Sequence, residues 1–183
     1  MGFADDDEQD DVTERPLSEP PEDRLPGIVS FEIVLNQSDD VAVLLTGMRV
    51  FPSGVAMVLG VRLRRRVRGM DMNVFDDVFD HRRFDEPADP AWQRGRLRWG
   101  FVFDDGSEVD NLDTTPSGIH LHGGGGGGNE QSCDRDYWLS SLPPSGSLDA
   151  FCEWTKAGLP RRTQSLDAGS IVQAAARSRR LWT

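Results

Sequence analysis

Short segments in which apolar residues occupy every second position recur along most of this sequence. Val29, Phe31, Ile33 and Leu35 form the first of these segments. A period of two is typical of β-strands with one buried face. Residues that favour turns separate the segments, and strand and helix patterns do not alternate regularly. The sequence therefore predicts an antiparallel, all-β fold.

Residues 41–67 and residues 94–111 are each predicted to form a β-hairpin. The first contains Pro52-Ser53-Gly54 between two apolar runs, and the second contains Asp105-Gly106 between two alternating segments. Both combinations favour tight turns. In residues 55–63 the alternation places apolar side chains on one face of the strand, which we expect to be the core face.

The last third of the chain adds further strands and a helix. Residues 137–142 and 147–154 flank a Pro-Pro-Ser-Gly turn, and residues 161–166 have another strand pattern. Asp167 is a suitable N-cap for a helix that ends the domain. We expect Leu181-Trp182 to pack back on the domain.

About seven or eight predicted strands favour an immunoglobulin-like antiparallel β-sandwich with a C-terminal helix. A small β-barrel is the alternative. One further helix, a short one, is predicted within residues 70–92, where apolar residues have helical spacing among aspartates.

Acidic residues are concentrated at the N-terminus. The net charge of the chain is −11, and residues 1–24 hold ten acidic residues against Arg15 and Arg24, so that segment contributes −8 and the rest −3. Residues 1–26 contain almost no apolar side chains and cannot bury enough surface to offset the entropy of ordering. The sequence therefore predicts a disordered acidic tail over residues 1–26 and one folded domain over residues 27–183.

Several turn and core residues near the C-terminus have a recognisable order. They are Trp138-Leu139, Leu142-Pro143-Pro144, Phe151-x-x-Trp154 and Gly158-Leu159-Pro160. On these residues, the region from Ile28 to the C-terminus resembles uncharacterised β-sandwich proteins of high-GC bacteria. The resemblance implies no activity, and no functional residue is transferred from it.

Arginines alternate with apolar residues on two of the predicted strands. If residues 62–68 and 94–98 lie on neighbouring antiparallel strands, their guanidinium groups share one solvent face. Like charges on neighbouring strands repel, so such a face requires counter-charges. Three sources are open: acidic loops of the domain, the acidic tail, or an external anion. The predicted interaction surface consists of Arg62, Arg64, Arg66, Arg96 and Arg98, with Trp92 as a candidate anchor.

These features favour a non-enzymatic binding module over an enzyme, with its function unknown. The sequence has no Gly-x-Ser-x-Gly nucleophile motif and no phosphate-binding loop ending in Gly-Lys-Ser or Gly-Lys-Thr. The expected partner is another protein or an anionic ligand that binds the arginine face. In this hypothesis the acidic tail covers that face until the partner displaces the tail. Nucleic acid is less favoured because the chain as a whole is acidic. No cofactor is expected.

His120 and His122 support an alternative function, a metal-dependent hydrolase. Two positions apart in a strand, their imidazoles share one face, as in metal-binding strands. Cys133 or Asp134 would complete the ligand set across the six glycines at 123–128, which we expect to form a flexible loop. Two surface histidines without a metal are the simpler interpretation.

The two cysteines, Cys133 and Cys152, are expected to be free thiols rather than a disulfide, and neither belongs to a zinc-binding pair. No apolar run reaches the length of a membrane span, and the chain does not begin with an export signal. We therefore expect a cytoplasmic protein that makes no membrane contact.

Overall fold

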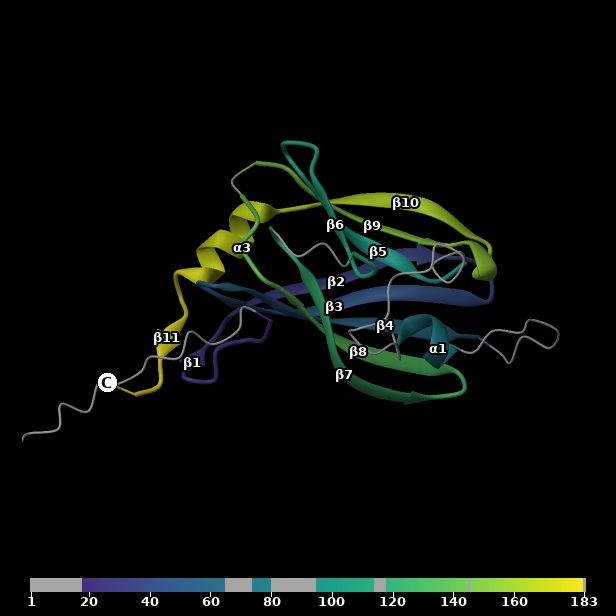
Figure 1. The fold of residues 1–183 in the computed structure, drawn as a ribbon, viewed down its shortest axis with the longest axis horizontal. Helices are drawn as coiled ribbons and strands as arrows, with labels where there is room; N and C mark the ends of the chain where they lie inside the picture. The colour runs from purple at the N-terminus through teal and green to yellow at the C-terminus, as the bar shows by residue number, and fades with distance from the viewer. Residues whose placement is uncertain (1–17, 65–73, 80–94, 114–117, 145, 183) are drawn as a thin grey trace, which may run out of the picture.

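The computed structural model describes residues 18–64, 74–79, 95–113, 118–144 and 146–182. Most of these residues lie in β-strands, which form a five-stranded sheet, a four-stranded sheet and a two-stranded ribbon, all antiparallel. Figure 1 shows the two larger sheets as two layers, with the ribbon at one end. The predicted all-β fold is confirmed. The described strands form no closed barrel, so the barrel alternative was wrong, and the immunoglobulin-like type stays a prediction.

The five-stranded sheet contains both apolar hairpin strands of the N-terminal half. Its strands, in spatial order, are β2 (Gly27–Gln37), β3 (Val41–Phe51), β4 (Gly54–Leu63), β8 (Ser132–Leu139) and β7 (Leu121–Asn129). β3 and β4 pair around Pro52-Ser53, as the turn residues predict. β2 and β7 are the two edges of this sheet.

The four-stranded sheet is built from the second predicted hairpin and two later strands. Its order is β10 (Leu159–Leu166), β9 (Leu148–Trp154), β5 (Arg98–Phe103) and β6 (Glu108–Asp110). β5 and β6 form the hairpin around Asp105-Gly106. β8 and β9 do not pair, because they belong to different sheets. The Pro-Pro segment between them therefore connects the two layers instead of forming a hairpin turn.

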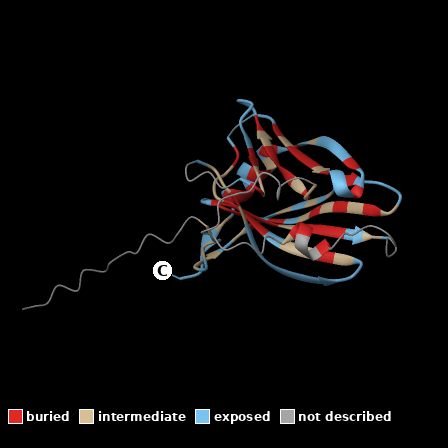
Figure 2. Ribbon diagram, turned by 45° about the vertical axis from the view of Figure 1, so that its right-hand side comes forward, coloured by how far each residue is buried: buried red, intermediate tan, exposed pale blue. Residues whose placement is uncertain are grey.

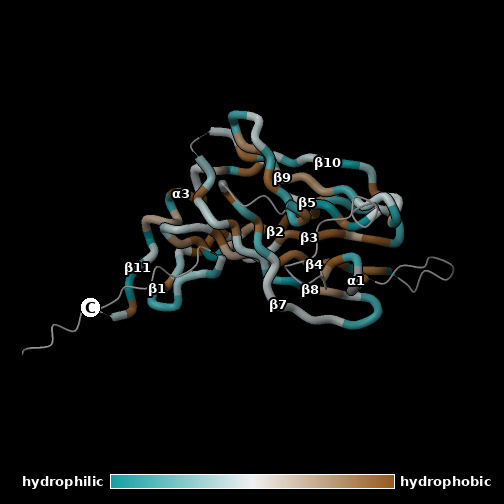
Figure 3. Tube along the Cα trace, in the orientation of Figure 1, coloured by the Kyte–Doolittle hydropathy of each residue, from teal (hydrophilic) through white to brown (hydrophobic). Residues whose placement is uncertain are grey.

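Side chains from the inner faces of both sheets share one hydrophobic core. The alternating apolar residues of β4, from Val55 to Val61, are buried as predicted. Trp99 of β5 meets Tyr137 of β8 from the opposite sheet, with ring centroids 4.7 Å apart and perpendicular planes. Figure 3 shows β3 and β4 coloured hydrophobic over much of their length. Burial of each large apolar side chain stabilises the fold by about 1.5–3 kcal/mol.

A buried amide joins the two sheets at the β2 edge. Asn36 donates hydrogen bonds from its side-chain nitrogen to the carbonyl oxygens of Cys152 in β9, at 3.0 Å, and Pro160 in β10, at 2.7 Å. β2 and β10 each have a register shift near these contacts. Gln164 of β10 also donates to the carbonyl of Val34. Side-chain hydrogen bonds thus connect two edges whose backbones do not pair.

The six glycines form part of an edge strand, so the prediction of a flexible loop was wrong. They lie in β7, which pairs with β8 on both sides of a register shift between Gly123 and Gly126. A Cβ atom added at Gly126 would lie 2.1 Å from the carbonyl oxygen of Asp134, and one at Gly128 would lie 2.0 Å from that of Ser132. Glycine allows this close backbone approach, which any side chain would prevent. Figure 2 shows β7 as an exposed strand at the bottom of the molecule.

Helix α1 (Val74–Val78) is the described part of the predicted helix within residues 70–92. It packs against β8 through Arg135, which donates to the carbonyl of Val78 at 2.6 Å and lies 5.1 Å from the ring of Phe79. The buried carboxylate of Asp77 pairs with Lys156 at 3.1 Å. These polar contacts fasten the short helix to both sheets.

The C-terminal helix is confirmed. A single turn of 3-10 helix (Thr155–Ala157) joins β9 to β10, and α3 (Ala168–Ala175) follows β10. Asp167 accepts a hydrogen bond from the backbone nitrogen of Ser170, as the predicted N-cap should. After α3 the chain forms β11 (Arg179–Arg180), which pairs with β1 (Arg24–Leu25). Part of the segment predicted to be a tail is therefore a strand, and residues 1–17 lie outside the described residues.

Candidate functional site

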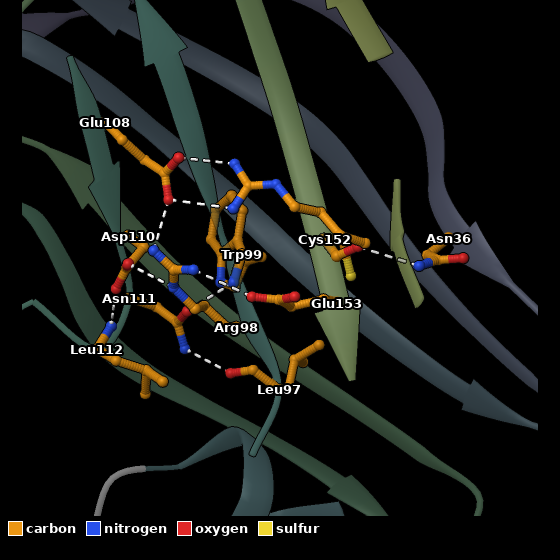
Figure 4. Close-up of polar contacts among 11 residues, drawn as sticks. Asn36, Leu97, Arg98, Trp99, Glu108, Asp110, Asn111, Leu112, Cys152 and Glu153 are labelled. Atoms are coloured by element: carbon orange, nitrogen blue, oxygen red, sulfur yellow. Dashed lines mark hydrogen bonds and ion pairs between the residues drawn. The ribbon is translucent and has the colours of Figure 1, made fainter. Parts of the chain in front are cut away.

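Arg98 is the centre of an ion-pair cluster on the outer face of the four-stranded sheet. Its guanidinium lies 2.8 Å from Asp110, 2.5 Å from Glu108 and 3.1 Å from Glu153. Figure 4 shows these carboxylates reaching Arg98 from β6 and β9, the strands on either side of β5. Three carboxylates around one guanidinium leave Arg98 little capacity to bind an external anion.

Arg161 of β10 extends the same cluster. Its guanidinium donates to both carboxylate oxygens of Glu108, at 2.7 and 3.3 Å, and lies 3.8 Å from the centre of the Phe151 ring. The hydrogen bond from Arg161 holds the pKa of Glu108 below its usual value. This sheet face is therefore neutralised by carboxylates of its own strands β6 and β9, a source of counter-charge that the sequence analysis did not consider.

The two described strands on which the predicted arginine face depends, β4 and β5, lie in different sheets. Arg62 is on β4, whose neighbours are β3 and β8, whereas Arg98 is on β5, whose neighbours are β6 and β9. The prediction required β4 and β5 to pair.

Each described arginine of the predicted surface has its own surroundings. Arg62 lies 2.8 Å from the carboxylate of Asp134. Arg96 is half-buried and donates to the carbonyl of Phe79 at 3.0 Å. Arg64 is exposed just beyond β4. Two residues of the predicted surface, Arg66 and Trp92, lie outside the described residues.

A different group of arginines lies where the two ends of the described chain meet. The terminal ribbon consists of β1 and β11 together with Arg177, Leu181 and Trp182. Its register pairs Arg24 with Arg180 and Leu25 with Arg179, and the backbone nitrogen of Leu181 donates to the carbonyl of Asp23 at 2.8 Å. Figure 1 shows the ribbon beyond α3, at one end of the molecule.

The arginines of the terminal ribbon differ from Arg62, Arg98 and Arg161 of the sheets, which have carboxylate partners. Among the described residues, no carboxylate lies within ion-pair distance of Arg24, Arg179 or Arg180. Arg177 donates to a backbone carbonyl, that of Ile28, at 2.8 Å. Across residues 18–25 and 177–182, four arginines stand against Glu19, Glu22 and Asp23, which leaves a local surplus of one positive charge.

Apolar side chains accompany these arginines on the surface. Leu25, Leu181 and Trp182 are 43%, 48% and 69% exposed. The prediction that Leu181-Trp182 packs back on the domain was therefore wrong. Residues 177–182 contain three arginines, no acidic residue and a tryptophan, and that composition was the signal that sequence reasoning overlooked.

The imidazole rings of His120 and His122 lie side by side, with their centroids 5.4 Å apart and their planes tilted by 45°. Burial, followed by the neighbouring His120, lowers the pKa of His122. Cys133 and Asp134 lie near the other end of the β7–β8 hairpin and do not join the pair. The described residues contain no group of three or more potential metal ligands among His, Cys, Asp and Glu.

Cys133 and Cys152 are free and buried, as expected. Burial raises the pKa of Cys133 to about 11 and that of Cys152 to about 12. Both thiols are therefore protonated near neutral pH and are poor nucleophiles. Both side chains belong to the hydrophobic core.

Comparisons with known proteins do not add a function: no protein-family model, curated protein or solved structure matches this chain. In the described part of the chain, no helix has the length and apolar character needed to cross a membrane.

Proposed function

We propose that this protein is a binding module that holds an acidic segment of another protein on its terminal ribbon. Its own acidic N-terminal segment competes for the same surface. The observation that carries this proposal is the register of β1 and β11, which sets Arg24 directly opposite Arg180 with no described carboxylate paired to either.

Like charges directly opposite each other destabilise an antiparallel pair. An anion that contacts both guanidinium groups would remove this repulsion and would gain charge-assisted hydrogen bonds. By contrast, Arg62 and Arg98 already have carboxylate partners. A new anion at those positions would have to displace them, so the terminal ribbon is the better site.

The ribbon also has the composition of a protein-binding surface. Arginine and tryptophan are enriched among the residues that contribute most to protein interfaces. Trp182 and Leu181 add apolar area beside the charges. A short acidic peptide contacts only this local positive surplus, whereas a long nucleic acid would also meet the net negative charge of the chain. A protein partner is therefore favoured over nucleic acid.

The N-terminal segment can reach the terminal ribbon because it directly precedes β1 in the chain. Residues 1–17 carry seven acidic residues against Arg15, and a short stretch of chain connects them to β1. Covalent attachment gives such a segment an effective concentration on the order of millimolar. A partner must therefore bind more strongly than this segment in order to replace it.

The proposal is tested with a labelled acidic peptide whose sequence is that of residues 3–14. Its binding to the full chain is measured by fluorescence anisotropy. In one variant the seven tail carboxylates are replaced by amides: D5N, D6N, D7N, E8Q, D10N, D11N and E14Q. We expect this variant to bind the peptide at least about tenfold more tightly than the natural chain, since internal competition is removed.

Two further variants identify the surface. In the neutralised-tail background, R24Q/R179Q/R180Q should abolish peptide binding. The control R62Q/R64Q/R162Q also removes three positive charges, from exposed arginines in or next to β4 and in β10, and should retain it. Addition of salt should weaken the remaining binding. Equal affinity of the two variants for the peptide would show that the peptide binds at another surface, and would contradict the proposal.

A further inference from the structure

The beginning of β7 holds two imidazoles in a defined arrangement. His122 is paired with Trp138 across the β7–β8 ladder. His120 lies just before the strand, and its backbone is fixed by Ser140: its nitrogen donates to the Ser140 hydroxyl at 2.9 Å, and its carbonyl accepts from the Ser140 nitrogen at 2.9 Å. Both backbones are therefore anchored to the same neighbouring strand.

The distance between the rings is close to that required by a shared metal ion. Zinc binds histidine nitrogen at about 2.0–2.1 Å, which places two rings on one ion with centroids about 4.5–5.2 Å apart for bond angles between square and tetrahedral. The observed centroid separation is 5.4 Å.

The chemistry of the pair also fits a metal. Both histidines are half-buried, which leaves access for a small ion. Neutral imidazole is a preferred ligand of zinc, copper and nickel.

We propose that His120 and His122 together bind one divalent transition-metal ion, with imidazole nitrogen as the only ligand from the described residues. Water or an external donor fills the other coordination positions. This proposal does not depend on the terminal ribbon. It assigns metal binding to the two histidines and does not assign a hydrolase activity to them.

The test is calorimetric titration of the full chain with Ni²⁺, together with electron paramagnetic resonance after addition of Cu²⁺. His81, the third histidine of the sequence, supplies a matched control. We expect the natural chain and H81Q to bind one ion with similar affinity, and H120Q and H122Q each to weaken binding by at least about tenfold. The Cu²⁺ spectrum should show two coupled imidazole nitrogens in the natural chain, and one each in H120Q and H122Q.

The acidic N-terminal segment is a competing source of metal ligands, but its carboxylates prefer harder cations and provide no nitrogen coupling. Circular dichroism of each variant checks that the fold is retained. Undiminished Ni²⁺ affinity in the double variant H120Q/H122Q would overturn the proposal, as would a Cu²⁺ spectrum without imidazole coupling.

Discussion

At Asn36 a single amide group takes the place of backbone pairing between two sheets. Its nitrogen bonds the carbonyls of Cys152 and Pro160, and the residue is buried. Arg98 has a comparable role on the outer surface, where it connects carboxylates from the strands on both sides. In both cases one polar side chain forms hydrogen bonds or ion pairs with groups on several strands. The sequence of a single strand does not reveal such contacts, because they depend on which strands are neighbours.

Replacement of Asn36 by Ala should lower the free energy of unfolding by about 1–3 kcal/mol, because it removes a buried hydrogen bond to the carbonyl of Cys152 and a partly buried one to that of Pro160. Urea unfolding followed by tryptophan fluorescence measures this change. The neighbouring Gln37 is exposed and is a suitable control. A loss in Asn36→Ala no greater than that in Gln37→Ala would show that the amide bridge contributes nothing.

Among the secondary-structure elements, β7 differs most from its prediction. A run of glycine has no alternation and low strand propensity, so local sequence favours a loop. Pairing with β8 overrides that preference, and the structure shows why glycine is tolerated: β8 lies too close for side chains at alternate positions. The hairpins around Pro52-Ser53-Gly54 and Asp105-Gly106 were predictable because their turn residues and alternation agree.

Neighbouring glycines of β7 should therefore respond differently to a methyl group. Gly126→Ala would place its Cβ 2.1 Å from the Asp134 carbonyl oxygen, whereas Gly125→Ala meets no atom within 4 Å. We expect Gly126→Ala to destabilise the fold by about 1–3 kcal/mol. Gly125→Ala should be neutral or stabilising by up to about 1 kcal/mol, since it restricts the unfolded chain.

Thermal unfolding of the two single variants and the natural chain provides the comparison. Equal midpoints for Gly125→Ala and Gly126→Ala would contradict the strand register described for β7.

For the whole molecule, alternation and turn chemistry were sufficient to predict an all-β fold and the C-terminal helix, because these depend on local sequence. The surface could not be predicted in the same way. Whether Arg62 and Arg98 share a face depends on which strands pair, and that pairing is set by long-range contacts. The terminal ribbon likewise joins Arg24 to Arg180, which are far apart in the sequence.

The central proposal is that the acidic N-terminal segment competes for the terminal ribbon. A spin label on Gln9→Cys tests it directly, because the native thiols are buried and have raised pKa values, so that only the new cysteine is labelled. The readout is paramagnetic broadening of the tryptophan indole NMR signals in the full chain. We predict preferential broadening of Trp182, relieved by R24Q/R179Q/R180Q and by salt at about 0.5 M. Broadening centred on another tryptophan, or none that depends on these arginines, would contradict the account.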